Sequence, residues 1–343
     1  MVRLSVLDQS PIAAGRKPAD AWAESLELAR ACDRLGYHRY WLAEHHATPA
    51  LACSAPEIMI ARIAGETRNM RIGAGGVMLS HYSPLKVAEQ FRMLELMFPG
   101  RIDLGIGRAP GSDGLTAVAL ASGPNGYSDG RFDPRHFPRQ VADLVGYLTD
   151  AMPAEHPFAH IAAMPVGPDA PPVWMLGSSD QSAQVAALLG TSFCFAHFIG
   201  GDAGAEVTAM YRKLFRPSAL QQAPATSVGT FVLVAESQEE ADRLARSRDL
   251  FLLRLRQGRH LPYPTPEAAE AHDYSAAEAA IVADGRSRAI VGTPEAVRAG
   301  IEELARAFGT EEVVALTICH DFGARLRSYE LLAEAFGLDR IAA

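Results

Sequence analysis

Residues 3–46 read RLSVLDQSPIAAGRKPADAWAESLELARACDRLGYHRYWLAEHH. The run from Arg3 to Asp8 predicts a short buried strand, because it is apolar and is followed by a turn rich in Pro and Gly. Apolar residues at helical spacing predict a helix from about Ala19 to Leu35, which ends at Gly36. Arg39 to His45 is strand-like again. The segment therefore predicts a strand, a helix and a second strand.

The same unit recurs along the chain. The predicted strands, each followed by a helical pattern, are Arg3 to Asp8, Arg39 to His45, Arg71 to Leu79, Arg101 to Gly107, Pro172 to Gly177, Ser192 to His197, Val228 to Ala235 and Glu312 to Cys319. Most are almost continuously apolar, which is typical of a parallel sheet covered by helices. We therefore expect a single α/β domain over residues 1–343, a (β/α)8 TIM barrel. An open, doubly wound sheet in two domains is the alternative, but no linker separates the halves.

Two stretches fall outside the repeated units. Residues 109–138, after the fourth strand, are rich in Gly, Asp, Pro and Ser, and residues 257–291, after the seventh, combine prolines with an Ala-rich helical pattern. Long insertions after barrel strands form lids or walls over the carboxyl-terminal face, where barrel enzymes keep their chemistry. A disordered surface loop is the alternative for the second insertion.

The composition limits the partners and the location. The net charge is −8 and no Lys/Arg cluster interrupts the chain, so neither nucleic acid nor an anionic membrane is an expected partner. The four cysteines lie far apart and favour neither a disulfide framework nor a zinc ribbon. No apolar run approaches the roughly 18 residues needed to span a bilayer. A cytoplasmic protein fits these features.

The second predicted strand ends in Glu44-His45-His46. Adjacent residues on a strand point to opposite sides, so only one histidine is expected to face the barrel cavity unless the strand has already ended. No further His, Cys or carboxylate has the spacing of a zinc site, so no metal is predicted. A histidine here is a candidate acid or base, and a packing residue is the alternative.

Glycines and one arginine mark the next two strands. Gly73, Gly75 and Gly76 are poor strand formers, so either a planar ligand lies against this backbone or the strand is bulged. Gly105 to Gly111 does not match a dinucleotide-binding fingerprint, because Pro110 occupies a position that requires glycine. Arg108 remains at the end of the fourth strand as a cation for an anionic ligand, or as a surface arginine.

The fifth strand turns directly into a helix through Gly177, Ser178, Ser179 and, one turn on, Ser182. Helix amino termini offer unpaired N–H groups and a positive dipole end, and small hydroxyl side chains let a phosphate approach them. The sequence therefore predicts a phosphate-binding segment, with simple capping of the helix by a serine as the alternative.

Taken together, these motifs resemble the bacterial luciferase-like flavin monooxygenases. The resemblance runs from Tyr40-Trp-Leu-Ala-Glu-His-His46 through Arg71 to Leu79, Pro99 to Arg108 and Gly177 to Ser179, and ends near Leu332. It implies a (β/α)8 barrel that binds reduced FMN, or the deazaflavin F420 in some branches, at the carboxyl-terminal face. It also implies that His45 is catalytic, that the peptide between Gly75 and Gly76 is cis beneath the flavin, and that Arg108 and the serine segment bind the phosphate.

The resemblance further implies a two-component monooxygenase. The chain has no nicotinamide-binding domain, so a separate reductase would supply reduced FMN, and O2 and a small organic molecule would be the other substrates. Gly107 stands where the luciferase α subunit has a reactive cysteine, so light emission is not expected. F420-dependent hydride transfer and a flavin-binding protein without turnover are the alternatives.

A homodimer is also expected, through the helices that follow the second and third strands. These helices carry more apolar side chains than one barrel contact requires, with core packing as the alternative; the residues are Ile58, Ile60, Ile63, Met93 and Met97.

Overall fold

A computed structural model describes residues 2–109, 111–121, 134–167, 169–200 and 203–339. Eight parallel strands close into a barrel, because the last of them pairs with both the first and the seventh. The barrel strands are β1 (Arg3–Asp8), β2 (Arg39–Leu42), β3 (Arg71–Met78), β4 (Ile102–Gly107), β5 (Val173–Gly177), β6 (Ser192–Ala196), β7 (Thr226–Val234) and β9 (Glu312–Leu316). The expected TIM barrel is therefore confirmed.

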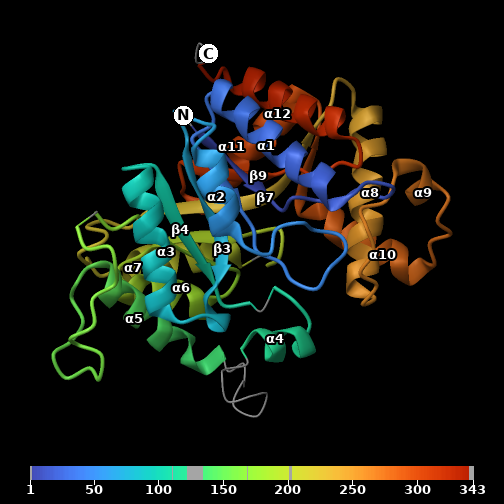
Figure 1. Cartoon of the computed structure of the whole chain (residues 1–343). Coiled ribbons are helices and arrows are strands. Elements are labelled where there is room, and N and C mark those ends of the chain that lie inside the picture. Colours follow the sequence, from blue (N-terminus) through green and yellow to red (C-terminus); the bar gives the residue numbers. More distant parts are fainter. Residues whose placement is uncertain (1, 110, 122–133, 168, 201–202, 340–343) are drawn as a thin grey trace.

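Helices surround the barrel (Figure 1). They are α1 (Pro18–Arg34), α2 (Pro56–Ala64), α3 (Pro84–Met97), α5 (Phe137–Leu148), α6 (Asp180–Leu189), α7 (Gly204–Leu214), α11 (Pro294–Phe308) and α12 (Phe322–Phe336). Several begin with proline in the first turn, where its missing N–H removes no helical hydrogen bond. No helix of the described residues is both long and apolar enough to cross a membrane. All four cysteines are buried free thiols.

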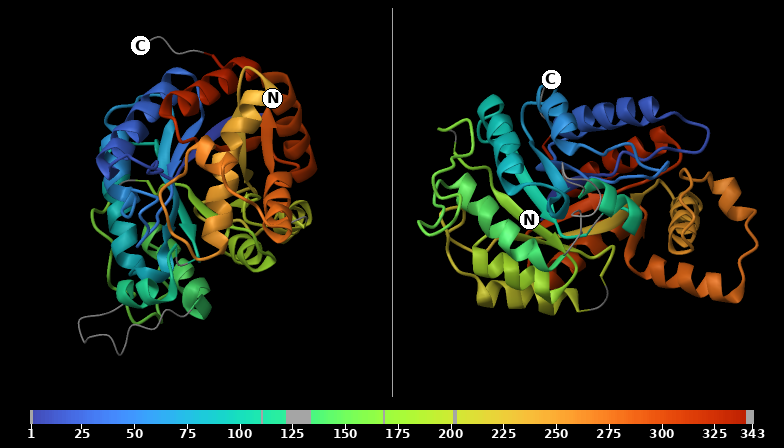
Figure 2. Two further views of the ribbon diagram at one scale, coloured as in Figure 1. Left: turned by 90° about the vertical axis from the view of Figure 1, so that its right-hand side faces the viewer. Right: turned by 60° about the horizontal axis from the view of Figure 1, so that its bottom comes forward.

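The segments after β4 and β7 add elements beyond the eightfold repeat. The described part of residues 109–138 contains α4 (Gly114–Leu120) and the short turn η2 (Pro134–His136), and η1 (Leu79–His81) follows β3. After β7 come α8 (Gln238–Arg256), α9 (Pro266–Glu270) and α10 (Ala276–Ser287). These three helices project to one side of the barrel in the right-hand view of Figure 2. The capping box at Ser275 and Glu278 starts α10 where the Ala-rich pattern predicts a helix.

Strand β8 and helix α11 are among the elements that were not anticipated from the sequence. Strand β8 (Ala289–Gly292) pairs with the carboxyl-terminal half of β7, from Phe231 to Val234. Helix α11, rather than α8, packs between α7 and α12 against β7 and β9. Strand β8 is four residues long and only partly buried, so its hydrophobic pattern is too short to distinguish it from a loop.

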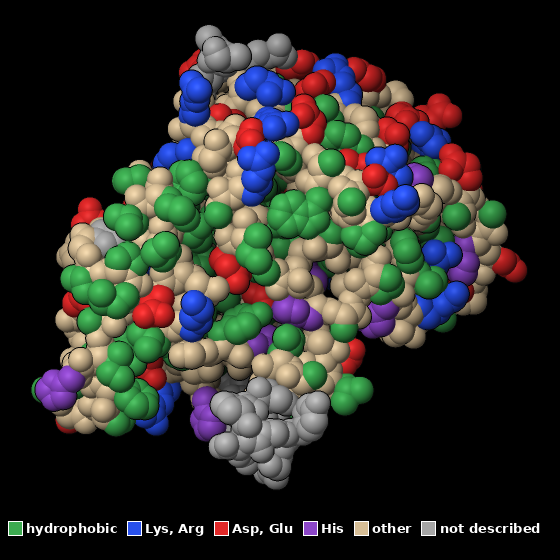
Figure 3. All heavy atoms as spheres, viewed as in Figure 1, with side chains coloured by type: hydrophobic (Ala, Val, Ile, Leu, Met, Phe, Trp, Pro, Cys, Tyr) green, Lys and Arg blue, Asp and Glu red, His purple; other side chains and the backbone are tan. Residues whose placement is uncertain are grey.

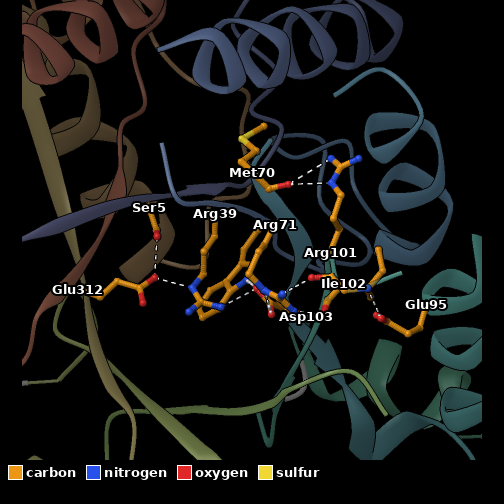
Figure 4. Close-up of polar contacts among 11 residues, drawn as sticks. Ser5, Arg39, Met70, Arg71, Glu95, Arg101, Ile102, Asp103 and Glu312 are labelled. Atoms are coloured by element: carbon orange, nitrogen blue, oxygen red, sulfur yellow. Dashed lines mark hydrogen bonds and ion pairs between the residues drawn. The ribbon is translucent and has the colours of Figure 1, made fainter. Parts of the chain in front are cut away.

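A buried ion cluster fills the amino-terminal end of the barrel (Figure 4). The guanidinium of Arg39 donates to Glu312 at 2.6 Å and to Asp103 at 2.8 Å, and Arg71 donates to Asp103 at 2.8 Å. Ser5 donates to Glu312, also at 2.6 Å. These residues come from β1, β2, β3, β4 and β9, so the cluster joins the closing seam of the barrel to the three strands beside it.

We predict that Arg39→Met lowers the free energy of unfolding by about 3–5 kcal/mol, because removing one partner of a buried ion pair leaves uncompensated charge. Glu312 would keep no cation, and Asp103 would keep Arg71 alone. Urea denaturation measures the change. The control is Arg246→Gln, an exposed arginine on α8, which should change stability by no more than about 0.5 kcal/mol. Equal effects of the two substitutions would contradict the assigned role of Arg39.

Candidate active site

A cavity of about 460 Å³ opens at the carboxyl-terminal end of the barrel. Its walls come from the loops after β2, β4 and β6, from β7, and from α8 and α10. Its floor belongs to an apolar cluster that contains Trp41 of β2 and two side chains that line the cavity, Phe231 of β7 and Phe251 of α8. Parallel strands end together at this face, so loops distant in sequence meet around one space.

Both His45 and His46 line this cavity. Strand β2 ends at Leu42, three residues before His45, and the backbone then turns: the N–H of His45 donates to Cys53 at 2.8 Å, and that of His46 donates to Gly111 at 3.1 Å. Strand alternation therefore does not direct His46 away from the cavity: β2 has already ended, so both histidines face the cavity. Alternation ceases where the strand ladder ceases.

His46 belongs to a hydrogen-bonded group with Glu44 and Tyr82. Its Nε2 lies 2.6 Å from a Glu44 carboxylate oxygen, which also accepts from the Tyr82 hydroxyl at 2.6 Å. The other oxygen of Glu44 accepts from the N–H of Met78 at 3.0 Å. A carboxylate at Nε2 favours the tautomer with its proton there, so Nδ1 of His46 is left as an acceptor. Sequence analysis missed Tyr82, which lies in no recognisable motif.

The His45 side chain is not part of a comparable hydrogen-bonded group among the described residues. Its Nδ1 is buried and has no hydrogen-bond partner in the described parts of the chain. Burial lowers the pKa of His45 to about 4, although Glu44 partly opposes this shift. His45 is therefore neutral at physiological pH, which suits a group that accepts a proton.

The glycines of β3 are required by close packing. The peptide between Gly75 and Gly76 is cis, as expected, and the pairing of β3 with β4 shifts register between Ala74 and Val77. A Cβ on Gly75 would lie 2.6 Å from the Leu7 side chain, and one on Gly76 would lie 2.8 Å from the backbone of Gly105. The bulge and the close contact with neighbouring strands are each sufficient to exclude larger side chains at these positions.

The predicted phosphate-binding residues surround the start of α6. Ser179 caps this helix by accepting from the N–H of Ser182 at 3.3 Å, and the Ser182 hydroxyl turns back to the Ser179 carbonyl at 2.7 Å. Gly177 packs against Ser182 so closely that no larger residue would fit. Arg108 donates to Gln181, on the first turn of α6, at 2.7 Å.

A second cavity of about 490 Å³ lies along α6, from Gln181 in its first turn to Leu188 near its end. Arg108, Arg135, Gln181 and Ser182 are among its lining residues. Two guanidinium groups beside a helix amino terminus fit an anionic group such as a phosphate.

The predicted site residues are thus divided between two places. His45 lines the first cavity, and Arg108 and Ser182 line the second. Gly75, Gly76, Gly177, Ser178 and Ser179 are not among the described residues lining either one. The loop after β4 contributes lining residues to both cavities: Arg108 lines the second and Gly111 lines the first. Among the described residues, no three His, Cys, Asp or Glu side chains are grouped as a metal site.

Comparison with known proteins finds close relatives. Residues 2–311 match the family described as luciferase-like monooxygenase. YceB of Bacillus subtilis (strain 168) is 43% identical, over 98% of this chain and all of its own length. The N-acetyl-S-alkylcysteine monooxygenase of the same organism is 37% identical, over 98% of each chain. The crystal structure of apo-MsnO8 is 39% identical, with a TM-score of 0.89, and the match covers 99% of this chain and all of the other.

More distant structures share the fold alone. The oxygenating constituent of 3,6-diketocamphane monooxygenase from Pseudomonas putida, solved with FMN, has a TM-score of 0.69 at 19% identity, and the match covers all of each chain. An F420-dependent secondary alcohol dehydrogenase, solved with an F420–acetone adduct, has the same TM-score at 13% identity, over 97% of this chain and 98% of the other. Both FMN and F420 therefore occur in proteins with this barrel.

We predict that His45 makes the stability of the protein depend on pH. Its folded-state pKa of about 4 is below its ordinary value of 6.5, so the unfolded chain takes up the proton first as the pH falls. The stabilisation is complete above about pH 6.5 and is lost as the pH falls toward 4. His45→Gln should flatten this dependence by up to about 1.4 kcal/mol per pH unit.

Urea denaturation across this pH range measures the slope. The control is His260→Gln, because His260 is exposed at the rim of the same cavity. An unchanged slope in His45→Gln would show that His45 titrates equally in the folded and unfolded protein.

Proposed function

The chain belongs to the luciferase-like monooxygenase family and is a flavin-dependent oxidoreductase, and on this premise we propose that it is the oxygenase component of a two-component FMN monooxygenase. A separate reductase would deliver reduced FMN, and O2 and a small organic molecule would be the co-substrates. The observation that carries the proposal is the half-buried His45, whose Nδ1 has no hydrogen-bond partner among the described residues, at an apolar cavity on the carboxyl-terminal face.

Arg108, Arg135 and the first turn of α6 would hold the flavin phosphate. The two guanidinium groups supply positive charge for a dianion, and Gln181 already holds the Arg108 guanidinium beside α6. Ser179 and Asp180 already accept two of the N–H groups in the first turn of α6, so the arginines would provide most of the contact. Gly75 and Gly76 would let the flavin approach the backbone of β3, with Gly177, Ser178 and Ser179 completing the phosphate end. When bound, reduced flavin supplies the electrons that activate O2.

Within the cavity, His45 would accept a proton from the reacting centre. Its neutral imidazole is available at physiological pH, whereas Nε2 of His46 is occupied by Glu44. His46, held in the cavity wall by Glu44, would accept a hydrogen bond from the substrate through Nδ1. The apolar side chains of the floor and of α8 would exclude water while the reaction proceeds.

F420-dependent hydride transfer is the second candidate, because an F420-dependent enzyme shares this fold. We further propose a cytoplasmic location, which the four free thiols favour.

We predict that the purified chain oxygenates a thioether probe such as N-acetyl-S-benzylcysteine when it is supplied with FMNH2 and O2. This probe follows from the name of the relative that is 37% identical. His45→Ala should retain FMNH2 binding but lower turnover by about 10²–10⁴-fold, the usual contribution of a general acid or base. His46→Ala should lower turnover less than His45→Ala does. Product analysis with ¹⁸O2 measures the turnover of both variants. Hydride transfer from F420H2 without O2 consumption would favour the F420 enzyme, and a larger defect in His46→Ala would reverse the roles of the two histidines.

A homodimer is the proposed assembly, and it would form through α2 and α3. Hydrophobic side chains gather over these helices in the space-filling view (Figure 3). Ile58 is 62% exposed, Met93 47% and Met97 49%, and they line a groove with Met164 and Pro165. In contrast, Ile60 and Ile63 are buried in the core of the barrel protein, so their expected place at the interface is wrong.

We predict that light scattering gives twice the 36.8 kDa of one chain at micromolar concentration. The double substitution Ile58→Glu, Met93→Glu should give the monomer, because it places two charges in the proposed apolar contact. Leu214→Glu, at an exposed leucine on α7, is the control and should leave the dimer intact. A wild-type mass equal to one chain would exclude the assembly.

A further inference from the structure

Gln9 lines the same cavity as the two histidines. It directly follows β1 and is half-buried. The N–H of Ala43 donates to the carbonyl of Asp8 at 2.9 Å, and this bond joins the ends of β2 and β1. Gln9 and His46 therefore lie on neighbouring loops. The Gln9 carboxamide makes no hydrogen bond with the described residues and its polar atoms are not buried, so its N–H groups and its oxygen are available to a ligand.

His46 presents a free acceptor to this cavity. Its Nε2 lies 2.6 Å from the carboxylate of Glu44, a residue that is 1% exposed. The hydroxyl of Tyr82 and the N–H of Met78 donate to the same carboxylate, at 2.6 and 3.0 Å, and fix its position. A carboxylate can only accept, so Nε2 of the neutral ring carries the proton and Nδ1 has a lone pair. Nδ1 makes no hydrogen bond with the described residues and, unlike Nδ1 of His45, it is not buried.

Most other polar groups of the cavity are engaged within the protein. The hydroxyl oxygen of Thr48 accepts from the N–H of Ala50 at 3.2 Å. The charged side chains that line the cavity take part in ion pairs or in helix capping; they are Asp113, Arg248, Asp249, Arg256 and Arg288. The remaining walls are mainly apolar and include Phe198, Phe231, Phe251 and Leu252. A ligand with an apolar body therefore meets Gln9 and His46 as neutral polar partners.

We propose that Gln9 and His46 form a subsite for an amide, and that the substrate is a small molecule with an apolar body and an amide group. The amide N–H would donate to Nδ1 of His46, and the amide oxygen would accept from the Gln9 carboxamide. Glu44 is the positioning residue, because it holds the His46 ring with Nδ1 free. A site that binds a substrate N–H disfavours the analogue without it, because the acceptor is then left unpaired.

The amide is assigned to the substrate rather than to the flavin. The pyrimidine ring of a flavin also carries neighbouring N–H and carbonyl groups. However, the residues proposed to hold the flavin, among them Arg108, Gly75 and Gly76, are not among the described residues that line this cavity. The substrate assignment depends on the proposed oxygenase function, whereas the amide subsite can be tested without turnover.

Titration calorimetry without flavin or reductant tests the subsite. The probes are 3-phenylpropanamide and 4-phenylbutan-2-one, which share the phenyl group, the chain and the carbonyl. They differ only in that the amide has NH2 where the ketone has CH3. We expect the amide to bind about 5- to 50-fold more tightly than the ketone, as one hydrogen bond to an otherwise unpaired acceptor allows.

The two residues should affect the probes differently. His46→Leu should remove the preference for the amide over the ketone, because the acceptor of the N–H is lost. Glu44 keeps the Tyr82 hydroxyl and the Met78 N–H as donors in this variant. Gln9→Met should weaken binding of both probes by about 2- to 10-fold and leave the preference unchanged, because both probes carry the carbonyl.

Two further variants complete the series. Gln9→Glu has the shape of glutamine without its N–H donors, so it should weaken binding of both probes at least as much as Gln9→Met does. The control is His260→Gln, at an exposed residue on the rim of the same cavity, which should change neither affinity. The Gln9 side chain has no partner among the described residues, so its variants give an answer even if His46→Leu does not fold.

Titration with oxidised FMN separates the two sources of the amide group. Gln9→Met and His46→Leu should leave FMN binding within about twofold of wild type, whereas Arg108→Ala should weaken FMN binding and leave the preference for the amide unchanged. The proposal is overturned if wild type binds amide and ketone equally or binds neither, or if the Gln9 variants bind both probes as wild type does. It is also overturned if Gln9→Met or His46→Leu weakens FMN binding but not amide binding. None of these results depends on whether the chain oxygenates any substrate.

Discussion

Arg39 forms ion pairs with Glu312 and Asp103 inside the barrel, and the closed sheet depends on this contact. It joins β9, the strand that completes the barrel, to β2 and β4. Burying these charges is favourable only because each carboxylate accepts several hydrogen bonds, from Ser5, Trp41 and Arg71 in addition to Arg39. The cluster fills the amino-terminal end of the barrel (Figure 4), so open space is left at the carboxyl-terminal end, where the strands release their loops.

The carboxyl-terminal face is divided according to charge. At one end, Arg108 and Arg135 lie beside the start of α6 and fit a phosphate. At the other, the Arg248 guanidinium lies 4.2 Å from the centre of the Phe231 ring and donates to Asp249. Between them lies the turn after β2 with two histidines of different character, because Glu44 holds His46 while burial keeps His45 neutral.

Much of this could be predicted from particular residues. The run of strand and helix patterns identified the barrel, and the motifs around His45, Arg108 and Ser179 placed candidate residues at its carboxyl-terminal face. Side-chain direction could not be predicted in the same way. Alternation failed for His46 because β2 stops at Leu42, and the apolar pattern of α2 did not distinguish the buried Ile60 from the exposed Ile58. In each case a contact with a distant segment, rather than the local pattern, determines the direction.

The order of residues favours the barrel, because apolar runs of strand length alternate with amphipathic helices and no linker divides the chain into two open sheets. It also identifies the glycines of β3 as unusual for a strand, whereas their close contacts with neighbouring strands are decided by the tertiary structure. The pairing of Glu44 with Tyr82 and the ion pairs that join α8 to α10, Arg256 with Asp284 and Arg286 with Asp249, arise only in the folded chain. Hydrogen bonds and ion pairs act over a few ångströms, so residues far apart in sequence acquire these partners only after packing has brought their elements together.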